Sequence, residues 1–299
     1  MRISVLMAAH HSDLQIADAL ASIRQQRHPD WELLVVEYGS ADNTRLLVEA
    51  FGTLTGRPVT HLTLGQNHGA ASARNRLLEL ATGEGVAFLD PSDRWMPHHL
   101  TNAALRLLAD VDVVVSDVRI ERRPRPLEVV AASPQLALNP IRTLFVSDAL
   151  PVVSAVAFRR ALAGRAGFFD TQFRAAEARD FWLRGALQGA RFACTQHVTC
   201  RSVRPPDPDP AQLLLLAEQR VQFYEKHRDL PAIPAALRRR LLSASLVTKG
   251  RLVRATDPAG AAQYFLRAWS LQPMHVQTLG QLALSGVRPR AGSPTVRGD

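Results

Sequence analysis

Hydrophobic and polar positions change their period repeatedly over the first 120 residues. Short apolar runs of strand length alternate with stretches in which apolar residues recur at helical spacing, as at Leu14, Ala17, Leu20 and Ala21. This alternation is typical of an α/β protein with a mainly parallel sheet flanked by helices. The predicted strands are 3–9, 31–36, 59–64, 86–90 and 111–120, and the predicted helices are 14–26, 70–81, 97–108 and one that follows the turn at 39–42 and runs to 51.

The pattern weakens in the second part of the chain. The arginine and proline segment 122–126 interrupts it, and the apolar signal stays poor from 127 to 151. Residues 156–162 fit either a short helix or a strand, and 177–188 has the spacing of a helix. After the proline-rich segment 205–210, three further helices are predicted at 211–227, 234–254 and 258–271.

The length and the position of these elements predict the domain organisation. A chain of 299 residues can bury a sizeable core, so we expect one α/β domain over residues 1–204, with halves at 1–121 and 122–204. The last predicted helix resembles one tetratricopeptide-like unit, and a single unit cannot stack alone. We therefore expect a helical C-terminal region over 205–287 and a disordered tail over 288–299.

The charge is basic, but it is not gathered into one block. The net charge is +9, and only Lys226 and Lys249 are lysines among the 36 basic residues. No nucleic-acid-binding motif accompanies this charge, so we predict no nucleic-acid partner and favour a basic face for phosphate-bearing ligands or an anionic membrane surface. The arginine run 238–240 is consistent with a solvated helix face or with a peripheral membrane contact.

Other features bear on compartment and assembly. Cys194 and Cys200 are too few for a disulfide framework or a complete metal site, which indicates a reducing compartment. The chain enters a strand pattern directly and has no run of 18 apolar residues, so neither a signal peptide nor a membrane span is predicted. We expect a cytoplasmic protein, with peripheral contact to the inner face of the membrane and a homo- or hetero-oligomer left open.

The segment 83–95, GEGVAFLDPSDRW, is the most informative stretch for chemistry. An apolar strand there ends in Asp90 and Asp93, which bracket a proline turn. The segment 67–75, NHGAASARN, precedes it and opens a helix that carries Arg74. Open α/β sheets bind ligands at the carboxyl ends of their strands, so these residues predict a site for a charged small molecule.

Five segments in order resemble the family 2 glycosyltransferases, which have the GT-A fold. The resemblance covers roughly residues 3–200, and five ordered segments are more specific than any single motif. The matching segments are SVLMAAHH (4–11), DWELLVVEYGSADNT (30–44), NHGAASARN (67–75), GVAFLDPSDRWMP (85–97) and EARDFWLRGALQGARF (177–192).

The resemblance implies a GT-A, Rossmann-like domain in which residues 1–121 form the nucleotide-sugar half and 122–204 the acceptor half. It further implies a nucleotide-sugar donor, such as a UDP-sugar, a glycan, lipid or peptide acceptor, and a divalent metal, Mn²⁺ or Mg²⁺, bound by carboxylates. The diphosphate leaving group needs positive charge, and the acceptor hydroxyl needs a carboxylate to take its proton. The implied nucleotide-sugar residues are Ala8, His10, Glu37, Tyr38, Arg74 and Asp90, and the implied metal ligands are Asp90 and Asp93.

Three acidic positions of the family differ in this chain. Tyr38 stands where an aspartate usually accepts from the uracil ring, and Ser92 stands where an aspartate usually binds the metal, which should weaken metal affinity. Ala178 takes the place of the general base. Glu177 and Asp180, three residues apart on one helix face, remain as the candidate catalytic carboxylates.

For several of these residues the sequence is consistent with either a structural or a functional role. His10 either contacts the base or only ends a strand, and Asp93 is either a metal ligand or a turn cap. Arg74 either pairs with Glu37 or Asp90 or contacts the nucleotide. The aromatic residues 181 and 182 belong to the core or wall the acceptor pocket.

Three functions follow from these observations. The first is sugar transfer from a nucleotide sugar, with inversion, and the second is a catalytically inactive GT-A pseudoenzyme that serves as a binding or assembly partner. The replacement of three working carboxylates in one chain motivates the second. The third, a nucleotidyltransferase of similar topology, lacks the glycine-rich phosphate loop after the first strand.

Overall fold

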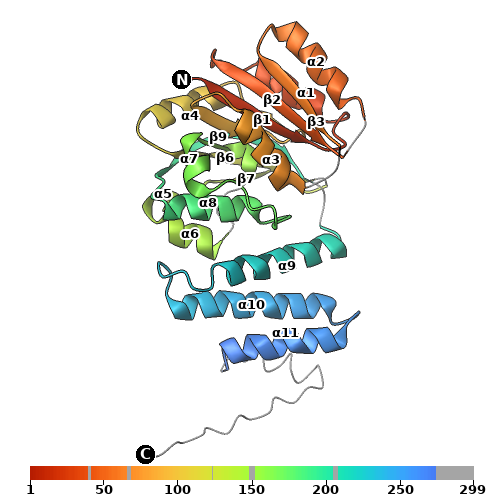
Figure 1. Cartoon of the computed structure of the whole chain (residues 1–299), viewed down its shortest axis with the longest axis vertical. Coiled ribbons are helices and arrows are strands. Elements are labelled where there is room, and N and C mark those ends of the chain that lie inside the picture. The colour runs from red at the N-terminus through yellow and green to blue at the C-terminus, as the bar shows by residue number, and fades with distance from the viewer. Residues whose placement is uncertain (40–41, 66–68, 123, 148–151, 205–207, 274–299) are drawn as a thin grey trace, which may run out of the picture. The chain divides into compact units, whose positions relative to one another are not determined.

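A computed structural model of the chain describes residues 1–39, 42–65, 69–122, 124–147, 152–204 and 208–273 (Figure 1). The chain divides into two compact units, Met1–Asp207 and Pro208–Asp299, and the boundary lies in the proline-rich segment 205–210. The predicted disordered tail and the predicted helical region beyond residue 273 lie outside the described residues. So do Asn67 and His68, the first two residues of the segment NHGAASARN.

Within the described residues, the first unit is built on one nine-stranded sheet. The strand order is β3-β2-β1-β4-β8-β6-β9-β5, and β7 pairs with β6 outside this path. The strands are β1 (Ile3–Ala9), β2 (Trp31–Tyr38), β3 (Val59–Leu64), β4 (Gly85–Phe88), β5 (Asp93–Trp95), β6 (Val113–Glu121), β7 (Glu128–Val130), β8 (Val156–Arg159) and β9 (Phe192–Val203).

The sheet is mainly parallel, with antiparallel strands in its second half. β1 pairs in parallel with both β2 and β4, β2 with β3, and β6 with β9. β8 lies antiparallel between β4 and β6, while β5 and β7 are antiparallel to β9 and β6. Because β8 is antiparallel to both β4 and β6, these two strands run in the same direction, and β9 runs parallel to β6. The carboxyl ends of β4, β6 and β9 therefore lie at the same edge of the sheet.

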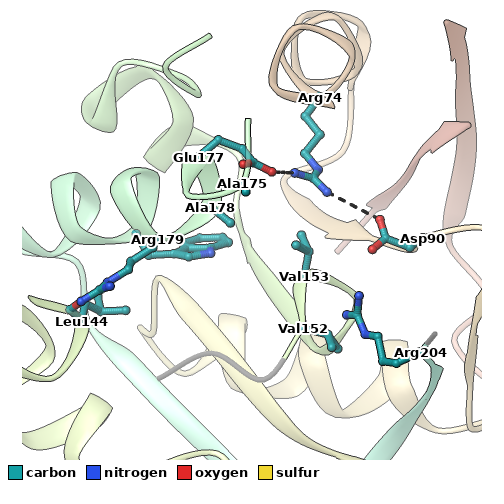
Figure 2. Close-up of a pocket in the computed structure, with 11 residues that line it drawn as sticks. Arg74, Asp90, Leu144, Val152, Val153, Ala175, Glu177, Ala178, Arg179 and Arg204 are labelled. Atoms are coloured by element: carbon teal, nitrogen blue, oxygen red, sulfur yellow. Dashed lines mark hydrogen bonds and ion pairs between the residues drawn. The ribbon is translucent and has the colours of Figure 1, made fainter. Parts of the chain in front are cut away.

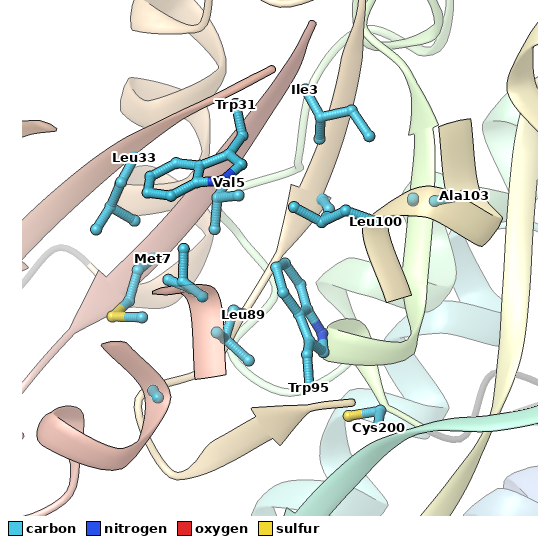
Figure 3. Close-up of a cluster of buried hydrophobic side chains, with 14 of the residues drawn as sticks. Ile3, Val5, Met7, Trp31, Leu33, Leu89, Trp95, Leu100, Ala103 and Cys200 are labelled. Carbon is cyan, nitrogen blue, oxygen red and sulfur yellow. The ribbon is translucent and has the colours of Figure 1, made fainter. Parts of the chain in front are cut away.

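One face of the sheet carries the main hydrophobic core (Figure 3). Alternate residues of the strands, such as Val5, Met7 and Leu33, point into it and are fully buried, as the period of two along a strand requires. Three helices cover this face: α1 (Ile16–Arg24), α2 (Thr44–Thr55) and α4 (His99–Leu108). In α1, Ile16 and Ile23 lie seven residues apart on the buried side, which is the spacing of one helix face.

The other residues of the strands face a second, aromatic core. Phe88 and Phe158 come from the strands, and Phe169 and Phe181 pack against each other with ring centroids 4.4 Å apart. Trp182 meets Phe158 edge-to-face at 5.1 Å. The helices of this side are α3 (Gly69–Leu80), α7 (Ala161–Ala166) and α8 (Glu177–Leu187), with the short helices α5 (Gln135–Leu138) and α6 (Pro140–Val146) and a 3₁₀ turn at Val153–Ala155.

The α/β fold, the mainly parallel sheet and the helices predicted in the first 120 residues are confirmed. Strands 3–9 and 59–64 have the predicted bounds, and the segment 156–162 contributes a strand, β8. The structure adds three strands that the sequence did not predict, β5, β7 and β9. β5 has only three residues, and β9 is too irregular for strict alternation because its register against β6 shifts near Asp117.

Residues 208–273, the described part of the second unit, form three helices that pack side by side in chain order: α9 (Pro210–Lys226), α10 (Ala235–Val253) and α11 (Pro258–Leu271). Helix α9 begins with a capping box, in which the Asp209 carboxylate accepts from the Gln212 backbone. Gly250 of α10 faces Phe265 of α11 so closely that a Cβ there would lie 2.6 Å from the ring. The described helices include none that is long and apolar enough to cross a membrane.

Candidate active site

A pocket of about 270 Å³ opens in the first unit, where α3, α8 and the carboxyl ends of β4 and β9 meet (Figure 2). Two segments place charged and apolar side chains in the wall of this pocket. The turn after β4 projects Asp90, and the N-terminal end of α8 projects Glu177 and Ala178 toward the same space. The lining residues are Arg74, Asp90, Leu144, Val152, Val153, Ala175, Glu177, Ala178, Arg179, Trp182 and Arg204.

A buried ion cluster joins α3, α8 and the turn after β4. The Arg74 guanidinium donates to Glu177 Oε1 at 2.5 Å and lies 3.6 Å from Asp90 Oδ1. Arg74 is only 7% exposed, and its guanidinium lies 5.9 Å from the ring centroids of both Phe88 and Phe169. Burial by itself would lower the pKa of Arg74, but the two carboxylates outweigh it and raise that pKa. Arg74 is therefore a permanent charge that fixes both carboxylates.

Glu177 stands in the first turn of α8 with one of its oxygens uncommitted. Its Oε1 accepts from Arg74, whereas its Oε2 is buried and accepts no hydrogen bond from the described residues. The residue is 8% exposed and lines the pocket. Next to it, the Ala178 methyl group also lines the pocket, where the family motif carries a carboxylate. Glu177 is thus the carboxylate of α8 that faces the cavity.

Asp180, the other candidate catalytic carboxylate, is not among the pocket residues. It is fully buried and accepts from the Arg184 guanidinium at 2.8 Å. The same guanidinium donates to the carbonyl oxygens of Ala166 and Phe168, which end α7 and follow it. Asp180 thus holds Arg184 in place, and Arg184 connects α8 to the C-terminal end of α7 through hydrogen bonds.

Asp90 and Asp93 belong to one turn but occupy different environments. The Ser154 hydroxyl connects them, because it accepts from the Asp90 backbone N–H at 3.0 Å and donates to Asp93 Oδ2 at 2.6 Å. Asp93 is 1% exposed, and burial, reinforced by the neighbouring Asp90 charge, raises its pKa from 3.8 to about 6. Asp90 lines the pocket, whereas the Asp93 carboxyl points into the protein.

The donor set at this turn fits a divalent cation poorly. Mg²⁺ and Mn²⁺ prefer several hard oxygen ligands, and carboxylates above all. Here Ser92 is neutral, Asp93 is hydrogen-bonded in the interior, and Asp90 lies beside the Arg74 cation. In the part of the chain that the structure describes, no three acidic, histidine or cysteine side chains are placed to hold one ion. The assignment of Asp90 and Asp93 as metal ligands stays a prediction.

The strands β1 and β2 supply the remaining predicted residues. His10 Nδ1 donates to the Tyr38 carbonyl oxygen at 2.7 Å, and the two rings stack with centroids 5.2 Å apart. Burial raises the pKa of Tyr38, so its phenol stays protonated and can donate a hydrogen bond near neutral pH. Tyr38 also lies within electrostatic reach of the Arg74 cluster. Ala8 is half-buried on β1.

Glu37 is turned away from this cluster. Its carboxylate is buried and lies 3.1 Å from His61 Nε2 of β3. Of the two partners predicted for Arg74, Asp90 is present and Glu37 is not. Glu177 is the second carboxylate that pairs with Arg74. Phe181 and Trp182 are both core residues, and Trp182 in addition lines the pocket.

Two arginines of the pocket were not found from the sequence. Arg179 donates to the carbonyl oxygens of Leu144 and Phe145, so it holds the C-terminal turn of α6 against α8. Arg204 directly follows β9, a strand that was not predicted from the sequence. The β-branched residues of segment 192–203 were the signal that could have revealed β9, and with it the position of Arg204.

A mainly parallel sheet with a charged pocket at the carboxyl ends of its strands is the arrangement in which open α/β folds bind ligands. The chain belongs to glycosyl transferase family 2, whose family model matches residues 4–161. Two curated relatives match about a third of the chain. They are the putative teichuronic acid biosynthesis glycosyltransferase TuaG of Bacillus subtilis, 38% identical over 93 residues, and the UDP-Glc:alpha-D-GlcNAc-diphosphoundecaprenol beta-1,3-glucosyltransferase WfgD of Escherichia coli, 36% identical over 98 residues.

These matches cover 31% and 33% of this chain but only 36% and 38% of the two relatives. Solved structures agree over a longer span. S. aureus TarS 1-349 in complex with UDP matches 95% of this chain and 89% of its own with a TM-score of 0.67 at 18% identity. The mannosyltransferase PcManGT of Pyrobaculum calidifontis, in complex with GDP-Man and Mn²⁺, matches 95% of this chain and 84% of its own with a TM-score of 0.61 at 23% identity. At this level of identity the likeness shows the fold.

Proposed function

We propose that this protein transfers a sugar from a nucleoside-diphosphate sugar to an acceptor hydroxyl, with inversion at the sugar carbon. The observation that carries the proposal is the pocket at the carboxyl edge of the sheet, where Arg74 holds Glu177 and Asp90 around one cavity. Membership of family 2 supports it, as do the nucleotide-sugar donors named for relatives and structural neighbours. The acceptor class proposed is a glycan, lipid or peptide hydroxyl.

In this mechanism Glu177 takes the acceptor proton. The acceptor oxygen attacks the anomeric carbon, the bond from that carbon to the donor diphosphate breaks, and the nucleoside diphosphate leaves with the bonding electrons. The hydroxyl proton moves to Glu177 Oε2, which is buried beside the cavity and accepts no hydrogen bond from the described residues. Arg74 holds the other oxygen, Oε1, and so orients the carboxylate.

Nucleotide release separates this proposal from others. Purified protein is incubated with UDP-, GDP- and dTDP-sugars, with Mn²⁺ or with EDTA, and the release of nucleoside diphosphate and the binding of donor are measured. We expect one donor class to bind and to turn over, and Glu177→Gln to reduce turnover by about 10²- to 10⁴-fold with donor affinity unchanged. Glu79→Gln is the control, since Glu79 is an exposed carboxylate of α3 that is also paired with an arginine. If no nucleotide sugar binds under any of these conditions, the proposed function is wrong.

The second candidate function is donor binding without transfer, as in an assembly partner of an active enzyme. The Ala178 methyl group favours it, because it lines the pocket at the family position of the general base and cannot accept a proton. Donor binding without turnover in the native protein, together with turnover gained by Ala178→Asp, would support this reading. Turnover by the native protein that is lost in Glu177→Gln would refute it.

A further inference from the structure

Arg204 directly follows β9, a strand that lies outside the five family-like segments apart from its first residue, Phe192. It adds a cation to the lining of the pocket. β9 runs antiparallel to β5 with Ser202 opposite Asp93, so the chain two residues further lies beside the turn that holds Asp90 and Ser92. Figure 2 shows the Arg204 side chain extending from the end of β9 toward the space between Asp90 and the valines 152 and 153.

The Arg204 guanidinium is the uncommitted cation of the described pocket lining. Arg74 already faces two carboxylates, and Arg179 donates to two carbonyl oxygens of α6. Arg204 is half-buried, and no hydrogen bond or ion pair joins its guanidinium to the described residues, although its charge partly offsets the burial that raises the pKa of the Asp93 carboxyl. A guanidinium at a pocket wall with its hydrogen-bond donors unused is placed to receive an anion from a ligand, because its five donors match phosphate oxygens in pairs.

The same turn lacks what a divalent cation needs. Ser92 is neutral, Asp93 is buried on Ser154, and Asp90 is the carboxylate of this turn that reaches the pocket. A diphosphate leaving group nevertheless requires positive charge as its bond to the sugar breaks. We propose that Arg204 supplies this charge, so that the donor diphosphate binds to its guanidinium and donor binding is independent of a divalent metal. This inference rests on the proposed function, since it names the group that holds the diphosphate of the same donor.

Calorimetric titration with UDP, GDP and inorganic diphosphate tests the idea without knowledge of the donor sugar or the acceptor. Each probe is titrated into the native protein, Arg204→Gln, Arg204→Lys and Arg119→Gln, once in EDTA and once in Mn²⁺. Arg119 is the matched control, because it is an exposed arginine on the neighbouring strand β6 that does not line the pocket. Asp93, the carboxyl whose raised pKa the Arg204 charge partly offsets, keeps its hydrogen bond from Ser154 when Arg204 is substituted, so the fold should persist. Circular dichroism with thermal unfolding checks this.

We expect the native protein to bind UDP or GDP equally well in EDTA and in Mn²⁺. Arg204→Gln should weaken that binding about 10- to 100-fold, the equivalent of one or two charge-assisted hydrogen bonds, whereas Arg119→Gln should not. Arg204→Lys should retain part of the affinity, because the charge remains while the paired donors are lost. Binding that disappears in EDTA, or an equal loss in Arg119→Gln and Arg204→Gln, would overturn the inference and leave the proposed function standing. Absence of nucleotide binding in every condition would instead refute the proposed function.

Discussion

Asp93 is an ionisable carboxyl held in the interior of the first unit, and replacing it with asparagine should make the protein more stable near neutral pH. The carboxyl is 1% exposed and accepts from the Ser154 hydroxyl at 2.6 Å. An amide of the same shape keeps an oxygen for Ser154, and its NH₂ group can donate to the hydroxyl of Ser202, the residue that β9 places opposite Asp93. The substitution therefore removes a charge and preserves the packing.

The magnitude follows from the pKa of the group. Burial, with a contribution from the Asp90 charge, raises the pKa of Asp93 from 3.8 to about 6, so the folded state binds the proton more tightly than the unfolded chain does. The stability that this proton binding contributes is fully present below a pH of about 4 and is lost as the pH rises through about 6. The difference between the two pKa values, about 6 minus 3.8, corresponds to ~3 kcal/mol.

Urea unfolding at a series of pH values from about 4 to about 8, in EDTA, measures this effect. Relative to the native protein, Asp93→Asn should gain up to ~3 kcal/mol in unfolding free energy between the two ends of this range, with most of the gain between about pH 4 and about pH 6. Asp229→Asn, at a side chain that is 86% exposed, should show a flat difference over the same range. A flat difference for Asp93→Asn, or one that grows toward acid pH, would refute the reasoning.

Three further substitutions test buried contacts of the first unit. Arg74→Met should lower the unfolding free energy measured in urea by about 3–5 kcal/mol, because it leaves Glu177 buried without its partner. The double variant Arg74→Met, Glu177→Met should recover part of this loss. An equal loss of unfolding free energy in the single and the double variant would contradict the reasoning. Burial opposes the ionised form of Glu32, but hydrogen bonds from two hydroxyls and a backbone amide outweigh it and lower its pKa, so native stability should fall as the pH drops below about 4.5. Glu32→Gln should lose about 1–3 kcal/mol at neutral pH and lack this acid dependence, and a parallel pH profile would count against the assignment. Gly83→Ala should lower the thermal midpoint, since its Cβ would lie 2.7 Å from a backbone nitrogen of β1, whereas Gly164→Ala, with open space around it, should be neutral or stabilising.

The local pattern of the chain was sufficient for much of the fold. Strands 3–9 and 59–64 and the helix at 258–271 have the bounds that periodicity predicts. A strand or helix buried on one face repeats its apolar positions with its own period, so the sequence carries that information over a few residues. Four of the five segments that resemble family 2 lie in this regular part, and two of them contain Arg74 and Asp90.

The ion-pair partners of the charged residues could not be predicted from the local sequence pattern. The sequence offered Glu37 or Asp90 to Arg74, and the structure confirms Asp90. It also pairs Arg74 with Glu177, which is 103 residues away, and it pairs Glu37 with His61. The sequence also offered Asp93 to a metal, while Ser154, from a segment with no clear pattern, holds that carboxyl in the interior. Such contacts depend on which strands become neighbours, and no periodicity encodes that order.

The sequence by itself determined the fold class, the family and the segments that surround the site. Only the tertiary structure decided which of the candidate carboxylates face the cavity and which cation stands beside them. The physical reason is the strand order β4-β8-β6-β9, together with the antiparallel pairing of β5 on β9. Burial along one element is a local property, but a site at a sheet edge is made by residues that meet only after the whole sheet has formed. Arg204, at the end of a strand that the sequence reading missed, is placed beside Asp90 in this way.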